Sequence, residues 1–448
     1  MRRRARGAAL AGALGLLLAS CASGPALRVA VARPAVPAPA ENGPLRLDRE
    51  PVIAVGLAWD LDSLTLEVAE AEVREVSRPE GGRSLAARGA IAFRPRGRAV
   101  EVACALPAGG CGDVNLAGGV ALPDTVVLLR ARSPGGVPGF RWRGRDWRGT
   151  PHVFVNPRGR LTLVTRLPLE SYLLGVVPGE IGGLSQGLLE AGRAQAIAAR
   201  AYTLYYRGRR ASEGFDLYGT VEDQVYGPVD TERPLATTCV EGTRGEVALH
   251  DGQPIRANYC ADCGGITAEV WEAWPAAPAA YLESRRDRGE GGDFCAASPQ
   301  HRWRERWSAE ELLANVRRYA PVLGLELPPG GLGTLVDVRV DARSRSGRVW
   351  RLLVRGTAGE LAIPSYAVRG VLRRGGRPEL ILRSNLFKIG VRRDPATGRA
   401  LEVLASGAGA GHGVGLCQTG ALGMARRGAT AREILGHYYP RAEVRRLY

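Results

Sequence analysis

Short runs in which apolar and polar residues alternate fill most of the chain from Pro51 onwards, and they constrain its fold more than any other feature. They include VIAVGLAW, SLTLEVAEAEV, RAVEVACAL and TVVLLRAR, and later TLVDVRVDAR, RVWRLLVRG and ELILRSNLFKI. A period of two, interrupted by glycine and proline, predicts β-strands. One long helical pattern, QGLLEAGRAQAIAARAYTLYYR (residues 186–207), and a shorter one in TGALGMARRG accompany them. Because strands and helices do not alternate regularly, the sequence predicts an α+β fold.

The N-terminus has the composition of an export signal. Residues 1–20 combine a positive start with an apolar run from Ala8 to Ala19, which is too short for a permanent membrane span. The sequence LASC before ASG resembles a bacterial lipobox, in which the cysteine, here Cys21, is lipidated. Simple cleavage beside an incidental cysteine is the alternative. We expect an exported, lipid-anchored envelope protein that faces the periplasm from the inner or outer membrane.

Composition and charge divide the mature chain and restrict its partners. Residues 21–48 are rich in alanine and proline, as is typical of a semi-extended tether. Residues 49–135 form a β-rich region, and residues 136–448 form the core that carries the motifs. The formal net charge of +16 favours acidic polymers. The sequence contains no basic recognition helix, zinc-finger spacing or RNA-binding signature, so nucleic acid is not expected.

Four groups of motifs carry the functional signal. In chain order they are LPLESYLLGVVPGEI with EAGRAQAIAARAYTLYY, then DQVYG, then ANYCADCGGITAEVW with DFCAASPQHRW, and last GAGAGHGVGLCQTGALGMARRG with EILGHYYP. Together they resemble the SpoIID/LytB family of bacterial cell-wall proteins, which includes stage II sporulation protein D and the amidase enhancers. The resemblance spans roughly residues 50–448 and implies a largely β-strand core with a few helices around a glycan-binding groove.

The resemblance implies lytic transglycosylase activity on peptidoglycan, preferentially on glycan strands stripped of their peptides. The β-1,4 bond after N-acetylmuramic acid (MurNAc) is cleaved without water, because the sugar's own 6-hydroxyl attacks and leaves a 1,6-anhydro end. Ordinary glycosidases use two carboxylates, whereas here one carboxyl can serve as both acid and base. The resemblance assigns that role to Glu180, whose apolar surroundings in YLLGVVP would raise its pKa. The alternatives are a glutamate that merely begins a helix, and a non-catalytic peptidoglycan-binding enhancer of a cell-wall amidase.

The same motifs give six candidate glycan-binding residues, which are Gln195, Arg193, Arg200, Tyr226, His412 and Gln418. Arg193 could meet the lactyl carboxylate that peptide removal exposes, or it could lie on a solvated helix face. Gln195 could equally cap a buried backbone group, and Tyr226 could be a core aromatic residue. The glycines around His412 allow the backbone to approach a ligand closely. We expect Glu170 to make structural hydrogen bonds from a strand or turn.

The cysteines suggest one structural metal site. Cys260, Cys263, Cys295 and His301 could supply three thiolates and an imidazole to a tetrahedral zinc ion. Because export permits disulfides, a bond from Cys295 to either of the first two is the alternative. A catalytic zinc is not expected, since the histidines are few and form no HExxH pattern. No cofactor is needed for the chemistry. We also expect a disulfide between Cys104 and Cys111, and buried or mutually bridged Cys239 and Cys417.

Overall fold

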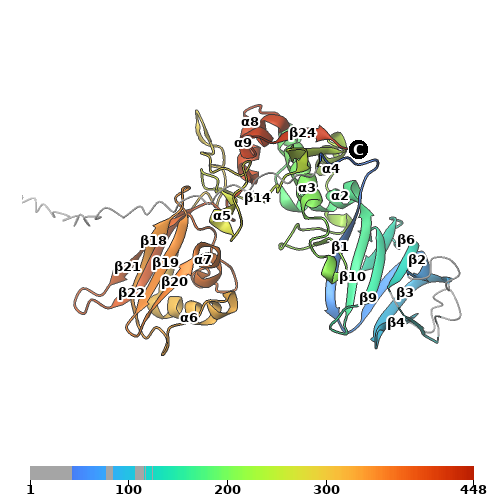
Figure 1. Cartoon of the computed structure of the whole chain (residues 1–448), viewed down its shortest axis with the longest axis horizontal. Coiled ribbons are helices and arrows are strands. Elements are labelled where there is room, and N and C mark those ends of the chain that lie inside the picture. The colour runs from blue at the N-terminus through green and yellow to red at the C-terminus, as the bar shows by residue number, and fades with distance from the viewer. Residues whose placement is uncertain (1–42, 77–83, 106–115, 117, 124) are drawn as a thin grey trace, which may run out of the picture.

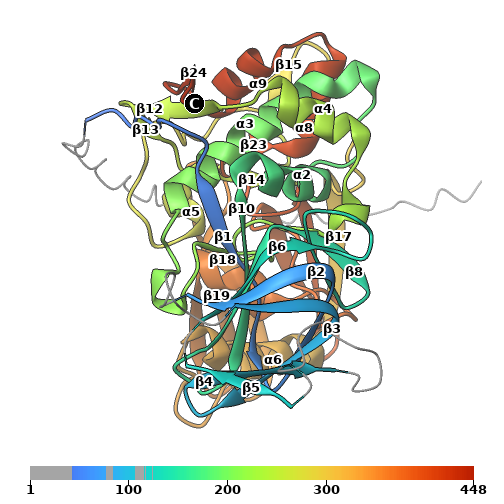
Figure 2. The same cartoon turned by 90° about the vertical axis from the view of Figure 1, so that its right-hand side faces the viewer.

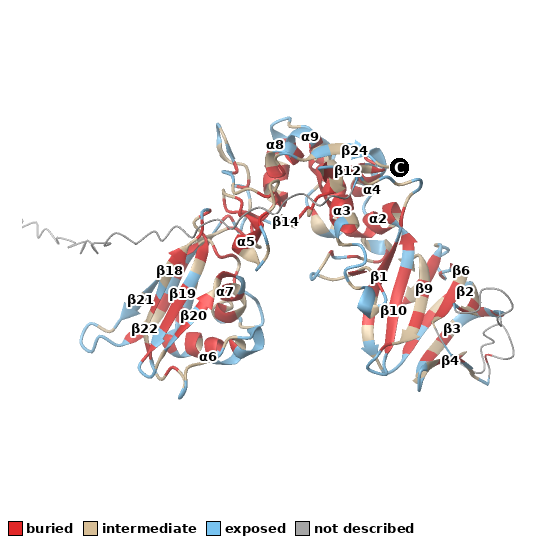
Figure 3. Ribbon diagram, in the orientation of Figure 1, coloured by how far each residue is buried: buried red, intermediate tan, exposed pale blue. Residues whose placement is uncertain are grey.

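The computed structural model describes residues 43–76, 84–105, 116, 118–123 and 125–448 (Figure 1). In this part of the chain, the buried apolar side chains form three large clusters. One belongs to the N-terminal sheet, one to a helical lobe (residues 169–301 and 409–448), and one to a distal lobe (residues 302–408). The N-terminal sheet and the distal lobe lie at opposite ends of the molecule, and the helical lobe joins them. Each of the two has its own buried residues (Figures 1 and 3).

The N-terminal sheet has the order β11-β1-β10-β9-β6-β2-β3-β4-β5, with β7 and β8 attached beside β2. Its strands are β1 (Val52–Leu61), β2 (Leu64–Glu75), β3 (Ser84–Arg96), β4 (Ala99–Cys104), β5 (Val120–Leu122), β6 (Val126–Arg132), β7 (Gly139–Trp142), β8 (Arg145–Arg148), β9 (Thr150–Val155), β10 (Leu161–Pro168) and β11 (Leu217–Tyr218). The alternation seen in the sequence places one face inward, since Leu64, Leu66 and Val68 are buried. The predicted β-rich N-terminal portion is confirmed.

The helical lobe follows directly from this sheet and carries the motifs. Its helices are α2 (Leu169–Glu180), α3 (Leu189–Tyr206), α4 (Pro234–Gly242), α5 (Val270–Ala273), α8 (Gln418–Arg426) and α9 (Ala431–Tyr438). Its short strands are β12 (Glu246–His250), β13 (Gln253–Pro254) and β24 (Glu443–Arg446), the pair β14 (Tyr259–Cys260) and β23 (Leu416–Cys417), and the pair β15 (Arg288–Gly289) and β16 (Gly292–Asp293). Figure 2 shows α2, α3, α4, α8 and α9 gathered at one end of the molecule, beyond the strands of the N-terminal sheet, while α5 lies apart from them.

The distal lobe contains two three-stranded sheets and two helices. The sheets are β17 (Arg302–Ser308), β22 (Ala400–Ala408) and β21 (Phe387–Arg393), and β18 (Leu335–Arg343), β19 (Val349–Gly356) and β20 (Glu360–Pro364). The helices are α6 (Ala309–Tyr319) and α7 (Ser365–Leu372). The described residues therefore confirm the predicted α+β class. None of their helices is both long enough and apolar enough to span a lipid bilayer.

Two local predictions were wrong. Glu170 was expected on a strand or turn, but it lies in the first turn of α2. The run ELILRSNLFKI was expected to be one strand, but β21 begins only at Phe387. Before it, Ser384 and Asn385 donate side-chain hydrogen bonds to backbone carbonyls of other segments. Such bonds compete with strand pairing, and here they hold the chain in a loop.

Candidate active site around Glu180

Glu180 is the last residue of α2 and lines a cavity of about 200 Å³. The helix stops there because Ile181 adopts an extended backbone conformation. Glu180 does not begin a helix, so that alternative is wrong. At a helix C-terminus the partial negative charge of the free carbonyls disfavours a carboxylate. The position therefore supports a protonated side chain.

The Glu180 carboxyl group is half-buried and receives hydrogen bonds from three other segments. The backbone N–H of Val225 donates to Oε1 at 3.0 Å, and Gln418 Nε2 lies 3.5 Å from Oε2. The Tyr259 side chain is the third partner. Burial raises the pKa of Glu180, and the three hydrogen bonds lower it by less than burial raises it. A raised pKa suits a group that must donate a proton near neutral pH.

Tyr259 is positioned by Gln224, a buried residue of the DQVYG motif. Gln224 Nε2 donates to the Tyr259 hydroxyl oxygen at 2.9 Å, while its Oε1 accepts from Thr203 Oγ1 at 2.7 Å. Because the Tyr259 oxygen accepts this bond, its own proton is free to point toward Glu180. Sequence reasoning missed both residues. A signal was available in the sequence, because both are polar residues within recognised motifs. Gln224 lies in DQVYG, which was singled out for Tyr226, and Tyr259 lies in ANYCADCGGITAEVW, which was singled out for its cysteines.

His412 lines the same cavity and is a neutral residue. Burial, together with the positive charges of Arg369 and Arg348, lowers the pKa of His412 to about 3. Its Nδ1 accepts from the backbone N–H of Val414 at 3.0 Å. Its ring packs on Trp274, with the centroids 4.7 Å apart. His412 can therefore shape the cavity and offer a hydrogen bond, but it is not a general acid near neutral pH.

Two further carboxylates line the cavity. Asp223 accepts from Arg209 Nη1 at 3.0 Å and from the backbone N–H of Tyr218 at 2.9 Å, so it is held in place by other groups. Glu222 is exposed and its carboxylate is bonded to the Thr220 hydroxyl. Glu180 meets hydrogen-bond donors that carry no charge, and burial raises its pKa, so it is the carboxyl group that the geometry favours as the acid.

Comparison with known proteins agrees with this geometry. Residues 157–250, which include Glu180 and Gln224, match the family described as Stage II sporulation protein. Stage II sporulation protein D of Bacillus subtilis is 25% identical over 63% of this chain and 75% of its own length. The chain belongs to the SpoIID/LytB family. Its role is therefore connected with the bacterial cell wall.

Other relatives extend this picture. The Amidase enhancer of Bacillus subtilis is 24% identical over 60% of this chain and 39% of its own length. An uncharacterized protein of Brachyspira hyodysenteriae is 28% identical over 67% of this chain and 73% of its own length. Residues 292–415, which cover the distal lobe and the His412 loop, match a family described as Domain of unknown function (DUF8618). The SpoIID/LytB motifs thus lie on both sides of the distal lobe, which matches a domain of unknown function.

Arg200 of this SpoIID/LytB protein does not line the cavity, contrary to its predicted role in glycan binding. It is fully buried in α3, and its Nε and Nη2 donate to Glu170 at 2.9 and 2.7 Å. Glu170 also accepts from the Tyr448 hydroxyl at 2.6 Å and from the Gly245 N–H at 3.1 Å. Glu170 therefore has the structural role expected of it, and Arg200 is its partner.

Three other predicted glycan-binding residues also lie away from the cavity lining. Arg193 pairs with Glu190 on the same helix. Tyr226 is buried in an aromatic cluster with Tyr172, at a centroid distance of 5.2 Å, so its face is not available for stacking on a sugar. Gln195 is fully buried, and neither its amide oxygen nor its amide nitrogen has a hydrogen-bond partner among the described residues. Of the six candidates, the structure brings His412 and Gln418 to Glu180.

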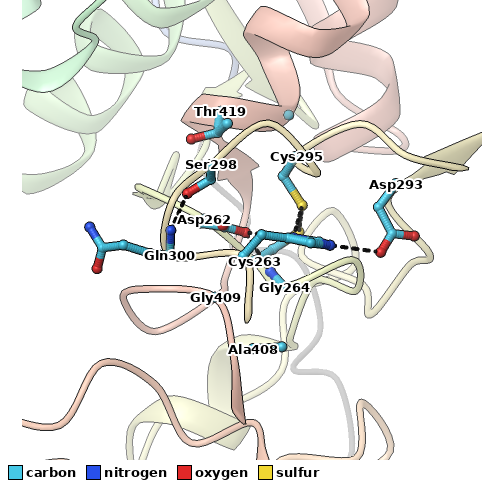
Figure 4. A network of polar contacts seen from close by, with 12 residues as sticks. Asp262, Cys263, Gly264, Asp293, Cys295, Ser298, Gln300, Ala408, Gly409 and Thr419 are labelled. Atoms are coloured by element: carbon cyan, nitrogen blue, oxygen red, sulfur yellow. Dashed lines mark hydrogen bonds and ion pairs between the residues drawn. The ribbon is translucent and has the colours of Figure 1, made fainter. Parts of the chain in front are cut away.

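The cysteine cluster differs from the predicted set. The donor atoms of Asp262, Cys263, Cys295 and Cys417 all lie within 4.8 Å of one another, and all four residues are buried. Figure 4 shows Asp262, Cys263 and Cys295 close together. Cys260 is not a member of this group. It pairs with Cys417 in the parallel β14–β23 ladder, which brings Cys417 to Cys263. Sequence reasoning missed Cys417 because 154 residues separate it from Cys263.

The donor chemistry of this cluster fits a metal ion. The Cys263 and Cys295 sulfur atoms are 3.8 Å apart, and tetrahedral zinc–thiolate bonds of about 2.3 Å imply an edge of about 3.8 Å. Asp262 Oδ2 is buried and has no hydrogen-bond partner among the described residues. His301 Nδ1 lies 3.4 Å from Cys295 Sγ, while its Nε2 faces Asp293 at 3.1 Å. A carboxylate behind a histidine is the usual support for a metal ligand.

The remaining cysteine predictions have mixed outcomes. Cys239 and Cys417 are buried as expected, but both are free, so they are not bridged to each other. Cys295 is also free, which argues against its predicted alternative disulfides. Cys104 is disulfide-bonded. Its expected partner Cys111 and the expected lipidation site Cys21 lie outside the described residues.

Proposed function

We propose that this protein is a peptidoglycan lytic transglycosylase that cleaves the β-1,4 bond between MurNAc and N-acetylglucosamine (GlcNAc) in peptide-stripped strands. The observation that carries the proposal is one half-buried carboxyl group, Glu180, which has a raised pKa and lines a cavity. The protonated carboxyl would donate its proton to the leaving glycosidic oxygen. The MurNAc 6-hydroxyl would attack C1 and return its proton to the carboxylate. The sugar gains a 1,6-anhydro ring, no water is consumed and the acid is regenerated.

Hydrolysis would require a second carboxylate to activate water or to attack the sugar. Asp223 is bonded to Arg209 and Tyr218, and Glu222 is exposed at the cavity edge. The geometry favours the single-carboxyl mechanism because Asp223 forms an ion pair with Arg209 and Glu222 is exposed, whereas the half-buried Glu180 meets neutral hydrogen-bond donors. The products distinguish the two mechanisms, since hydrolysis leaves reducing ends and transglycosylation leaves anhydro ends.

The test is digestion of purified peptide-free glycan followed by mass spectrometry. We expect anhydro-MurNAc ends from the wild type and from Glu222→Gln, and intact strands from Glu180→Gln. Glu222→Gln is the matched control, because it makes the same substitution at the same cavity. Reducing ends would assign hydrolysis. Undiminished anhydro products from Glu180→Gln would refute the role of Glu180.

The match to an amidase enhancer favours a second candidate, a non-catalytic factor that binds peptidoglycan and stimulates a wall amidase. Under this candidate the strands remain intact with the wild type and with Glu180→Gln. A purified cell-wall amidase should then release peptides faster from intact sacculi in the presence of either protein.

We also propose that the protein is exported and held at the membrane by a lipid on Cys21. The basis is the lipobox-like LASC and the short apolar run before it. Wild-type protein should incorporate a labelled fatty acid and sediment with membranes, whereas Cys21→Ser should do neither. Equal labelling of both proteins would refute the assignment.

We further propose that the cysteine cluster holds a structural zinc ion. Cys263, Cys295 and Cys417 would supply three thiolates, with Asp262 or His301 completing the tetrahedron. A closed site of this kind stabilises the fold and takes no part in the chemistry. It would join β23 to the segment that holds Cys263 and Cys295.

Metal content tests this assignment without reference to activity. Protein purified without chelators should contain about one zinc per chain, and Cys417→Ser should lose it. Cys260→Ser and Cys239→Ser should keep it, because neither residue belongs to the cluster. Loss of zinc in Cys260→Ser would show instead that Cys260 is a ligand, as the sequence predicted. Absence of metal together with thiols lost to oxidation would instead indicate a disulfide.

A further inference from the structure

A second cavity, of about 220 Å³, adjoins the Glu180 cavity where the distal lobe meets the helical lobe. Trp274 and His412 line both cavities, so the two are direct neighbours. The distal lobe contributes two arginines to this second cavity, Arg348 and Arg369. We call this cavity the arginine pocket.

Arg348 is buried with two donor groups unused. Arg348 directly precedes β19, and the residue is 3% exposed. Its Nη2 donates to the backbone carbonyls of Cys263 and Ile266 at 2.8 and 2.9 Å. Its Nε and Nη1 have no partner among the described residues. A buried guanidinium with free N–H groups requires an acceptor, because the charge has lost its water.

Glycine at position 413 makes room for this guanidinium. A Cβ at Gly413 would clash with the Arg348 guanidinium, and the φ of +80° is one that glycine adopts readily. The close approach places Arg348 directly against the loop that carries His412. The charge of Arg348 contributes to the low pKa of His412. The distal lobe thus places a cation against the loop whose His412 lines the Glu180 cavity.

Arg369 supplies a second cation from helix α7. Its Nε donates to the Leu382 carbonyl at 2.8 Å. Burial lowers the pKa of Arg369 to about 10, so it stays protonated at neutral pH. Neither Arg369 nor Arg348 forms an ion pair with a carboxylate of the described residues.

The arginine pocket keeps a net positive charge. Glu272 also lines it, but one oxygen of its carboxylate accepts from the hydroxyls of Ser344 and Ser346. Its single charge can offset only one of the two arginines. A third arginine, Arg256, stands over the ring of Trp274 at 5.2 Å. An anionic group entering from the Glu180 cavity would therefore be attracted.

We propose that the arginine pocket binds a carboxylate of the glycan, namely the lactyl carboxylate of a MurNAc residue from which the peptide has been removed. This inference rests on the proposed function of the Glu180 cavity. A guanidinium binds a carboxylate through charge-assisted, often bidentate, hydrogen bonds. An attached stem peptide would turn that carboxylate into a neutral amide and remove the charge. The pocket would thus select peptide-stripped strands, a role that the sequence analysis gave to Arg193.

The surroundings favour a glycan over a small free anion. A third cavity, of about 560 Å³, neighbours the arginine pocket, and the two share Trp274 and Tyr366. The half-buried Trp350 also lines it. Aromatic faces with a few placed polar groups are typical of ligand-binding clefts. A strand lying across the arginine pocket would have Glu180 on one side and an aromatic surface on the other.

The test compares binding of two forms of one peptide-free glycan fragment, with free carboxylates or with the same carboxylates converted to neutral amides. The Glu180→Gln protein is used throughout, so that no cleavage occurs. We expect the acid form to bind on the order of tenfold more tightly. Adding Arg369→Gln should bring the ratio toward one, and Arg369→Lys should keep part of it.

Arg355→Gln is the matched control, because Arg355 is exposed on β19 of the same lobe and lies outside the arginine pocket. It should keep the full ratio, which separates the pocket from general charge. Equal binding of both glycan forms, or a ratio unchanged in Arg369→Gln, would overturn the inference. A different result would refute the proposed function alone: wild-type protein would leave the glycan intact, while the acid form still bound more tightly than the amide form.

Discussion

Replacing Glu170 by glutamine tests whether its ion pair with Arg200 holds the helical lobe together. Arg200 is fully buried and directs two N–H groups to Glu170 at 2.9 and 2.7 Å. Removing one charge of a buried pair leaves the other uncompensated, which costs about 3–5 kcal/mol. Glutamine keeps the size of the side chain and one acceptor oxygen. We therefore expect the free energy of unfolding to fall by about 3 kcal/mol, the lower end of that range.

The same pair makes stability depend on pH. Burial alone would raise the pKa of Glu170, but Arg200, Tyr448 and the Gly245 N–H hold it below its usual value of 4.5. A lowered pKa contributes stability that is present above the unfolded-state pKa and is lost as pH falls through the folded-state pKa. Wild-type stability should therefore decline below about pH 4.5. Glu170→Gln should lack this part of the decline.

Equilibrium urea unfolding, followed by tryptophan fluorescence at pH 7 and pH 4, measures both effects. Glu190→Gln is the matched control, because Glu190 pairs with Arg193 at the half-exposed surface of α3. An exposed pair contributes at most about 1 kcal/mol. If Glu170→Gln unfolds at the same urea concentration as Glu190→Gln, the buried pair does not stabilise the lobe as described.

Three further predictions concern the active-site cavity. Tyr259→Phe removes a hydrogen bond that lowers the pKa of Glu180, so the pH above which glycan cleavage declines should move upward while the maximal rate falls, as a pH–rate profile would show. His412→Gln should leave the shape of that profile between pH 5 and 8 unchanged, because the pKa of His412 is about 3; a lost limb near pH 6.5 would contradict this. Gly413→Ala should destabilise the protein by about 1–3 kcal/mol in thermal unfolding, because its φ is positive and the new Cβ would meet Arg348.

Periodicity predicted the regular parts of the fold. The alternating runs became β18 and β19, and the helical pattern of residues 186–207 became α3. Helix α2 was missed because its residues are apolar on every side and give no period of 3.6. The segment LESYLLGVVPGE forms a helix that is buried on most sides, so it has no amphipathic pattern that the sequence could reveal.

The candidate site was predictable only where a motif supplied it. Glu180, His412 and Gln418 were found, and the structure brings them together. Arg200 was misread because its role was inferred only from its place in the motif that forms α3. Its true partner, Glu170, lies 30 residues away on α2. Contacts of this kind depend on how the helices pack, which a local pattern does not contain.

The loop of residues 409–418 connects the features described above. Gly413 packs against Arg348 of the distal lobe, and Cys417 enters the cysteine cluster. The next residue, Gln418, begins α8 and faces Glu180 across 3.5 Å. A metal ion on Cys417 would therefore fix the start of α8 and the position of the Gln418 amide. A glycan carboxylate on Arg348 would act on the other end of the same loop. Both sites would thus help to place the groups around Glu180, the carboxyl proposed to perform the chemistry.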